Sequence, residues 1–311
     1  MVMPDFTDYL KLRAMPNRPN TFFKYMTAKV AKIVLVNQTL RWSSPLLFND
    51  PFDVKRDFDW GFDFEELKKP LLDEIMNLIS AKDIPDLSSQ PHIERLVNRL
   101  RRNPDFCNTV LPELPQWIEQ DIQSIKSGAY QVLKKQWSEF IPQFRILSLS
   151  AINDNPLMWS HYSDSHKGVV FELQGINHLD SPWLIAQPVV YQDPPPMLAT
   201  KQEWIKSMTG QKRLNHDKWQ FFTPYTLTKT TDWEHEKEWR VVSFMRPGES
   251  GLYTDYPFNP PEVCSVYLGC EISDEDTNDI ISLLNYDLSH VRAYRAKKLE
   301  HERKLSFEKI K

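Results

Sequence analysis

The chain is poor in cysteine and glycine, and it has no long apolar run. Its 311 residues include three cysteines and no C-x-x-C pair, so neither a disulfide framework nor a cysteine zinc site is indicated. The eight glycines form no G-x-G-x-x-G motif and no P-loop, which disfavours a Rossmann enzyme or a kinase. No segment approaches the roughly 20 apolar residues that span a bilayer. The first residues also lack the apolar core of a signal peptide. These absences predict a cytoplasmic protein with no membrane partner.

A strong net charge is lacking as well. The formal charge is −4 at pH 7, so no global basic field indicates nucleic acid, although a local basic patch keeps that partner possible. The hydrophobic content of 41% and the aromatic content of 12% are ample for a core. The length suits one large domain or one domain with a sizeable insertion.

The hydrophobic pattern changes its period along the chain, which indicates how the fold is organised. Residues 1–20 are polar and are expected to form an N-terminal arm. Period-two or β-prone segments predict strands at 21–25, 39–43, 145–150, 167–173 and 263–268. Helical spacing recurs instead at 64–80, 91–100 and 117–140. We therefore predict an α+β fold with a mixed, mainly antiparallel sheet. One domain is expected at 21–311, with a helical insertion at about 63–140.

The stretch W-E-H-E-K-E-W-R at 233–240 is the most unusual in the chain. If its backbone is extended, alternate side chains point to one face, and those are Glu234, Glu236, Glu238 and Arg240. Because neighbouring like charges raise the pKa of a carboxyl group, such a row requires cations, a metal or a ligand to balance it. The alternative is a solvated turn with surface ion pairs.

Four polar blocks, each beside core aromatics, are expected to line one cleft. The residues of these blocks that we select are Lys24 and Tyr25; Arg41, Ser43, Asn49 and Asp50; His161 and Tyr162; and Glu236, Glu238 and Arg240. His161 and His166 are five residues apart, which is not the spacing that puts two metal ligands on one helical face. No metal site is therefore predicted from this pair.

Four short motifs carry a resemblance to a known family. They are F-N-D-P-F-D at 48–53, L-M-W-S-H-Y at 157–162, H-K-G-V-V-F at 166–171 and E-x-E-W-R at 236–240. In this order they resemble the bacterial family known as domain of unknown function 2971. The resemblance covers about residues 21–310 apart from the helical insertion. It implies no activity, so the function must be argued from the site.

The order of the site residues also resembles that of ADP-ribosyltransferases. Those enzymes use a strand with Arg or His, a second strand with Ser or Tyr, and a late E-x-E motif. This chain departs from the pattern by having a lysine at position 24. The resemblance implies an intracellular effector enzyme that consumes NAD, in a toxin or phage-defence setting. Catalytic roles would fall to Glu238, Glu236 and His161. The residues that would bind NAD are Lys24, Tyr25, Arg41, Ser43, Asn49, Asp50, Tyr162 and Arg240.

Two other functions fit the same residues. A metal-dependent nuclease or other hydrolase would bind Mg²⁺ through carboxylate oxygens, with His161 or Lys229 near the phosphate. The carboxylates available for it are Asp50, Asp53, Glu236 and Glu238. A non-catalytic ligand-binding or sensor module is the other alternative. The macromolecular acceptor of a transferase is not indicated by the sequence.

Overall fold

The computed structural model describes residues 11–54, 62–197, 199–212, 224–299, 301–302 and 304–311. Residues 1–10 of the expected N-terminal arm therefore lie outside the described residues. The chain divides into two compact units. A β-rich unit consists of residues 1–55, 141–194 and 226–311, and a helical unit consists of residues 56–140 and 195–225.

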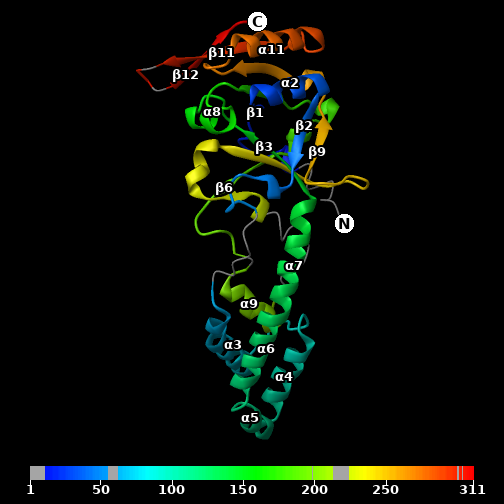
Figure 1. Ribbon diagram of the computed structural model, residues 1–311. Helices are drawn as coiled ribbons and strands as arrows, with labels where there is room; N and C mark the ends of the chain where they lie inside the picture. The colour runs from blue at the N-terminus through cyan, green and yellow to red at the C-terminus, as the bar shows by residue number, and fades with distance from the viewer. Residues whose placement is uncertain (1–10, 55–61, 198, 213–223, 300, 303) are drawn as a thin grey trace. The chain divides into compact units, whose positions relative to one another are not determined.

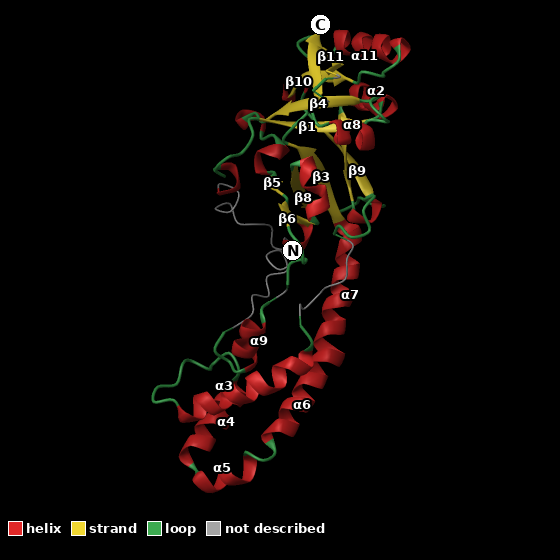
Figure 2. Ribbon diagram, turned by 90° about the vertical axis from the view of Figure 1, so that its left-hand side faces the viewer, coloured by secondary structure: helices red, strands yellow, loops and turns green. Residues whose placement is uncertain are grey.

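The β-rich unit is built on a mainly antiparallel sheet of ten strands in the described part of the chain (Figure 1; Figure 2). The main path through the sheet is β12 (Lys304–Lys309), β11 (Arg292–Leu299), β10 (Val263–Leu268), β4 (Val169–Gln174), β1 (Thr21–Met26), β3 (Phe144–Ser150), β2 (Thr39–Ser43) and β9 (Tyr253–Pro257). Strand β8 (Glu238–Phe244) pairs with β3 and with β5 (Gln187–Pro188). Strands β10 and β11 are parallel, as are β6 (Val190–Tyr191) and β7 (Thr228–Lys229) in a separate small sheet. The fold is α+β with a mixed, mainly antiparallel sheet, as the sequence predicts.

The central strands separate apolar from polar side chains by simple alternation. Leu147 and Leu149 of β3 lie in the hydrophobic core, as do Trp239 and Val241 of β8. Because successive side chains of a strand point to opposite faces, the residues between them face the other way. Those residues include Ser148 of β3, which lines a cleft. The alternation thus gives one face that packs into the hydrophobic core and a second face that carries the polar side chains of the cleft.

Helices α2 (Ala28–Asn37) and α11 (Asp274–Tyr286) pack into the core on the apolar face. Thr27 and Ser273 are their N-caps, and each side chain accepts a backbone N–H bond of the first turn. The other helical elements of this unit are η1 (Pro45–Leu47), η4 (Ile141–Gln143), α8 (Pro156–Tyr162), η5 (Asn177–Leu179), η6 (Pro182–Ile185), η7 (Thr231–Glu236) and η8 (Pro260–Glu262).

The helical unit has its own hydrophobic core, to which Leu71, Ile75, Ile118 and Ile122 contribute. Its elements are η2 (Phe64–Leu67), α3 (Lys68–Ser80), α4 (Pro91–Arg102), α5 (Pro104–Val110), α6 (Leu114–Ser124), a π-helical turn (Ile125–Ala129), α7 (Tyr130–Phe140) and α9 (Lys201–Met208). Ile205 of α9 packs into the same core. The helical unit therefore takes a second chain segment in addition to the insertion expected at about 63–140. No helix in the described part of the chain is long and apolar enough to cross a membrane.

The acidic stretch is not a continuous strand, so the expectation of one aligned row is wrong. Thr231–Glu236 forms the 3₁₀-helix η7, and Lys237 follows in a left-handed conformation with φ 46°. Strand β8 begins only at Glu238. Glu234 therefore lies outside the row, exposed and ion-paired with Lys237 at 3.1 Å. The left-handed residue breaks the alternation on which the expectation depends.

Candidate functional site

Strand β3 is the centre of a fork in the sheet. Strand β8 pairs with β3 from Phe144 to Ser150, so β1 and β2 must share the other edge. Each of them pairs with β3 at one position in the described residues, Phe23 with Ser150 and Ser43 with Ile146. Between these positions the Ser148 carbonyl accepts a hydrogen bond from Lys24 Nζ at 2.8 Å. A side chain thus takes the place of a strand partner at the fork.

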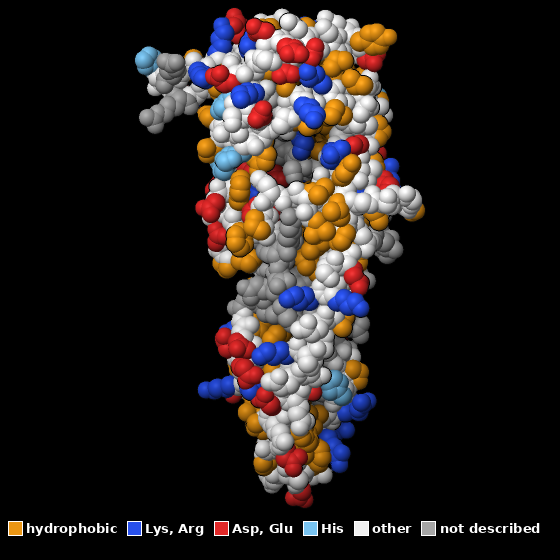
Figure 3. All heavy atoms as spheres, in the orientation of Figure 1, with side chains coloured by type: hydrophobic (Ala, Val, Ile, Leu, Met, Phe, Trp, Pro, Cys, Tyr) orange, Lys and Arg blue, Asp and Glu red, His pale blue; other side chains and the backbone are white. Residues whose placement is uncertain are grey.

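A cleft of about 410 Å³ opens at this fork. Its volume falls within the roughly 300–1,000 Å³ that is usual for small-molecule sites. In the space-filling view of Figure 3, a hollow is visible in the β-rich unit, with basic side chains at its edge. The cleft is lined by these predicted residues: Lys24, Tyr25, Arg41, Ser43, Asn49, His161, Tyr162, Glu236, Glu238 and Arg240. The expectation that four separated blocks meet in space therefore describes this cleft, with one exception.

The exception is Asp50, which does not line the cleft. Its Oδ1 accepts a hydrogen bond from the Phe52 backbone N–H at 2.8 Å. An aspartate before a tight turn commonly bonds its own backbone two residues on, and the Asp50 carboxylate is engaged in this way. The same turn instead contributes Asn49 and Asp53 to the lining.

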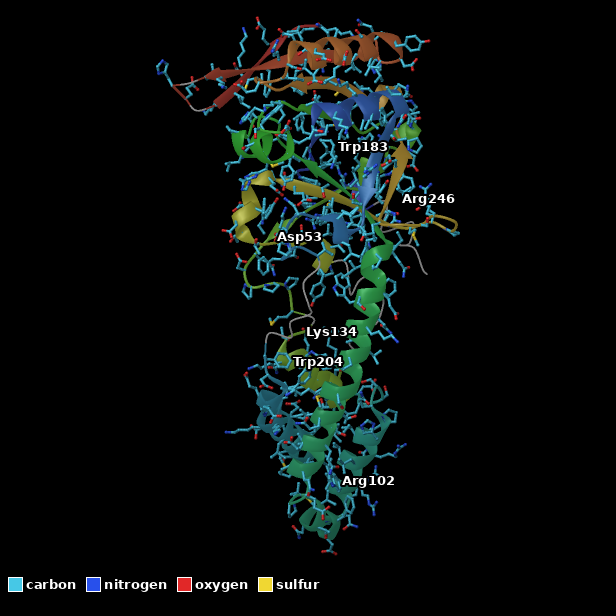
Figure 4. All side chains as sticks on the ribbon, viewed as in Figure 1. Asp53, Arg102, Lys134, Trp183, Trp204 and Arg246 are labelled. Atoms are coloured by element: carbon cyan, nitrogen blue, oxygen red, sulfur yellow. The ribbon has the colours of Figure 1, made fainter. Side chains whose placement is uncertain are left out.

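Arg240 is the centre of a buried ionic network. Its Nε and Nη2 donate to Glu238 Oε1 and Oε2 at 2.8 and 2.9 Å. Its Nη1 and Nη2 donate to Asp53 Oδ1 and Oδ2 at 3.0 and 2.6 Å. Nη1 also donates to the Thr226 carbonyl at 2.8 Å. The Arg240 side chain is 1% exposed, so both two-pronged contacts are shielded from water. Figure 4 marks Asp53 in the β-rich unit.

Lys229 is the second cation of the network. Its Nζ lies 2.6 Å from Glu236 Oε2 and 3.6 Å from Glu238 Oε2. Tyr162 donates its hydroxyl to the other Glu236 oxygen, Oε1, at 2.5 Å. The sequence predicts that cations, a metal or a ligand must balance these carboxylates. In the structure, side chains of the protein itself pair with them.

The network moves the pKa values of its two glutamates in opposite directions. Burial acts to raise the pKa of Glu238, but the charges of Arg240 and Lys229 outweigh it and lower that pKa to about 2. Burial raises the pKa of Glu236, and the charge of Glu238 adds to this effect. Lys229 and Tyr162 oppose the rise only in part. One cleft therefore holds a firmly ionised carboxylate beside a more basic one.

Lys24 adds a cation whose charge is sensitive to pH. Burial lowers the pKa of its ammonium group to about 8, and the negative charge of Glu238 acts against this lowering. At neutral pH the group is therefore still mostly charged. It lies at the fork, where a bound anion would meet it.

The rim of the cleft carries aromatic rings and a further cation, Arg41. The exposed His161 ring lies 6.4 Å from the Tyr162 ring and 6.4 Å from the Trp233 ring, centroid to centroid. Arg41 pairs with Asp255 at 2.9 Å, and its guanidinium lies 3.7 Å from the centre of the Tyr253 ring. Because Arg41 is held by these two contacts, it presents a positioned charge at the edge of the cleft.

Sequence reasoning missed two residues that orient the network. Ser148 bonds to Glu238 through its side chain as well as holding Lys24. Tyr191 accepts the Glu238 backbone N–H on its hydroxyl at 2.7 Å. The alternation in R-I-L-S-L-S could have placed Ser148 on the polar face, whereas no local pattern points to Tyr191.

The described residues contain no group of three or more His, Cys, Asp or Glu side chains arranged to hold a metal ion. Asp53 and Glu238, two of the proposed Mg²⁺ ligands, direct their carboxylate oxygens at Arg240. A metal ion at this position would have to compete with that guanidinium.

Residues 158–241 match the family described as "Protein of unknown function (DUF2971)". Over this segment the chain resembles the DUF2971 family. The DUF2971 segment includes His161, Tyr162, Lys229, Glu236 and Arg240, so it contributes much of the cleft lining. Lys24 and Asp53 come from outside it. Comparisons with curated proteins and with solved structures found no match.

Proposed function

We propose that the cleft binds NAD and cleaves the bond between its nicotinamide and ribose, in the manner of ADP-ribosyltransferases. The observation that carries this proposal is the pair Glu236 and Glu238, which line one cleft with pKa values moved in opposite directions. Environments that separate the pKa values of two neighbouring carboxyl groups are typical of acid–base pairs in catalysis. Glycosyl transfer is a reaction that uses two carboxylates in this way.

Each glutamate suits one part of that reaction. When the C–N bond breaks, its electron pair leaves with the nicotinamide ring nitrogen, and positive charge develops on the ribose. The ionised Glu238 would stabilise this charge electrostatically. Water or an acceptor group then attacks the ribose carbon and loses a proton. Glu236, as the more basic carboxylate, would accept that proton.

The rest of the lining fits the other parts of a dinucleotide. Lys24 and Arg41 supply positive charge for the pyrophosphate. The rings of Tyr25, Tyr162 and His161 offer surfaces for the base and the nicotinamide. Ser43 offers a hydroxyl for the ribose. We further propose that the protein acts in the cytoplasm as an effector enzyme in a toxin or phage-defence setting, on an acceptor still to be identified.

Nicotinamide release from NAD by the full-length protein tests the proposal. Glu238→Gln and Glu236→Gln should each lower the rate by about 10²–10⁴-fold, the usual contribution of such groups. Glu234→Gln is the matched control, because Glu234 lies in the same stretch but its side chain is 61% exposed and pairs only with Lys237 among the described residues. That variant should keep the wild-type rate. An unchanged rate in Glu238→Gln, or no nicotinamide release by the wild type, would reject the proposal.

A loss of folding must be separated from a loss of chemistry. Glu238 accepts two hydrogen bonds from Arg240, so Glu238→Gln is expected to lower stability by about 1–3 kcal/mol. Melting curves and NAD titrations on each variant provide the separation. A variant that is folded and binds NAD but releases no nicotinamide has lost the chemical step.

The Mg²⁺-dependent hydrolase has less support from the site. Its carboxylates are neutralised by Arg240 and Lys229, which weakens their attraction for a divalent cation. Loss of nucleic acid that depends on Mg²⁺, without nicotinamide release, would favour it. A non-catalytic binding module would instead bind nucleotide without turning it over.

A further inference from the structure

Helix α4 of the helical unit exposes a face made of basic side chains. His92, Arg95, Arg99 and Arg102 are its exposed long polar side chains. At 3.6 residues per turn these four positions fall within about 80° of arc and extend over about 15 Å. The opposite side of the helix is buried through Ile93, Val97 and Leu100. In Figure 3 basic side chains gather along the flank that corresponds to α4, and Figure 4 marks Arg102 there.

The arginines on this face are not neutralised within the described part of the chain. No carboxylate there forms an ion pair with Arg95, Arg99 or Arg102. The Arg99 guanidinium lies 4.0 Å from the centre of the Phe106 ring, which fixes its direction. The neighbouring Arg101 is different, because it donates to the carbonyls of Leu78 and Ile79 at the end of α3.

Ordinary helix chemistry explains only part of this arrangement. Basic residues in a last turn stabilise a helix through its dipole, which accounts for Arg99 and Arg102. Arg95 lies outside that turn. Solvated helix faces usually mix charges of both signs, as Lys69 and Asp73 do on α3. The face of α4 has one sign only, in a chain whose net charge is −4.

We propose that the face formed by His92, Arg95, Arg99 and Arg102 binds the phosphate backbone of a nucleic acid. Arginine forms two-pronged contacts with phosphate. The face is about 15 Å long, which equals the rise of about four base pairs along the axis of a duplex at 3.4 Å each, so its charges can lie beside several phosphates. A membrane surface fits less well, because the apolar side of α4 is buried and cannot enter lipid. This inference does not rest on the proposed reaction with NAD.

Fluorescence anisotropy with labelled 20-base-pair DNA, 20-base-pair RNA and single-stranded DNA tests the proposal on the full chain. Three arginine–phosphate contacts on a duplex should give a slope of about −2.7 for log affinity against log salt. Affinity should then fall about 40-fold between 50 and 200 mM salt. The Arg95→Gln/Arg99→Gln/Arg102→Gln variant should bind at least about 10-fold more weakly at 50 mM salt, and its slope should be shallower by about 2.7.

The matched control removes three exposed lysines from the same unit. Lys69→Gln/Lys82→Gln/Lys206→Gln makes the same change in net charge at other places on its surface, and it should bind like the wild type. Far-ultraviolet circular dichroism should show that both triple variants are folded, since glutamine is a good helix former. Three results would overturn the proposal: no binding by the wild type, equal weakening in both triple variants, or competition by polyglutamate as strong as that by DNA. The last would point to an acidic protein partner.

Discussion

Removing Arg240 is the perturbation for which the structure makes the sharpest stability prediction. Arg240→Ala would leave Asp53 and Glu238, which are 2% and 6% exposed, without the guanidinium that holds both. Breaking a buried ion pair from one side costs about 3–5 kcal/mol, because the partner charge stays buried. Lys229 remains 3.6 Å from Glu238 and 3.9 Å from Asp53, and it offsets only part of this cost. We therefore expect the free energy of unfolding to fall by about that amount at pH 7.

The same variant should show a characteristic dependence on pH. In the wild type the pKa of Glu238 is lowered to about 2. The ionised Glu238 therefore stabilises the fold above its unfolded pKa of about 4.3 and loses that effect as the pH falls towards 2. Without Arg240, only Lys229 and the bond from Ser148 still oppose the effect of burial, and we expect burial to raise the pKa of Glu238 above its unfolded value. Ionised Glu238 then destabilises the fold, and protonation relieves it. The difference in the free energy of unfolding between the wild type and Arg240→Ala should therefore be smaller at pH 5 than at pH 7.

Urea unfolding followed by tryptophan fluorescence at pH 7 and pH 5 provides the measurement. Arg41→Ala is the control, because Arg41 also faces the cleft and pairs with an aspartate, but its side chain is 54% exposed. A surface pair of that kind contributes about 1 kcal/mol or less. Equal stability of the two variants would refute the reasoning. A loss of stability in Arg240→Ala that is larger at pH 5 than at pH 7 would also refute it.

Three further predictions concern single side chains. NAD affinity, measured by calorimetry, should fall as the pH rises through about 8, where Lys24 loses its charge, and Lys24→Met should bind weakly with no such change. Tyr162→Phe removes a bond that lowers the pKa of Glu236, so the acid limb of the rate profile should move to higher pH; an unmoved limb would count against Glu236 as the base. Gly269→Ala should cost roughly 1–3 kcal/mol in thermal unfolding, because a Cβ there would lie 1.9 Å from the His166 carbonyl oxygen, whereas Gly128→Ala meets nothing within 4 Å and should not destabilise.

Periodicity predicts most helices and strands here because their burial is strongly one-sided. The N-cap at Ser273 and the alternation of 145–150 are local properties, and both occur in the structure. Strand β9 is not predicted, since its side chains alternate between exposed and half-buried at the sheet edge and none is buried. The alternation of Glu234 and Glu236 wrongly predicts a continuous strand. Charged residues alternate there, but the residues between them do not form a buried apolar face. Lys237 turns the chain between them and β8.

Most ion-pair partners of the acidic residues could not be predicted from the local sequence. Glu238 and Arg240 are two residues apart, so their pairing is predictable from strand geometry. Asp53 joins them from 187 residues away, and Lys229 reaches Glu236 from a two-residue strand. Only the fold brings these groups together. On the sequence alone, a metal ion is one way to balance the acidic residues, because these distant cationic partners cannot be identified from the sequence.

The separation between Asp53 and Arg240 also has a consequence in time. A bacterial or eukaryotic ribosome adds about 5–20 residues per second, so the 187 residues between them take about 10–40 s to make. During that interval β1 and β2 have been synthesised, but β8, which carries Glu238 and Arg240, has not. The cleft therefore cannot assemble on a nascent chain that has not yet reached β8, and a chain that stops short of β8 lacks Glu238 and Arg240. Any binding or chemistry that needs the whole cleft must therefore wait until β8 has been synthesised.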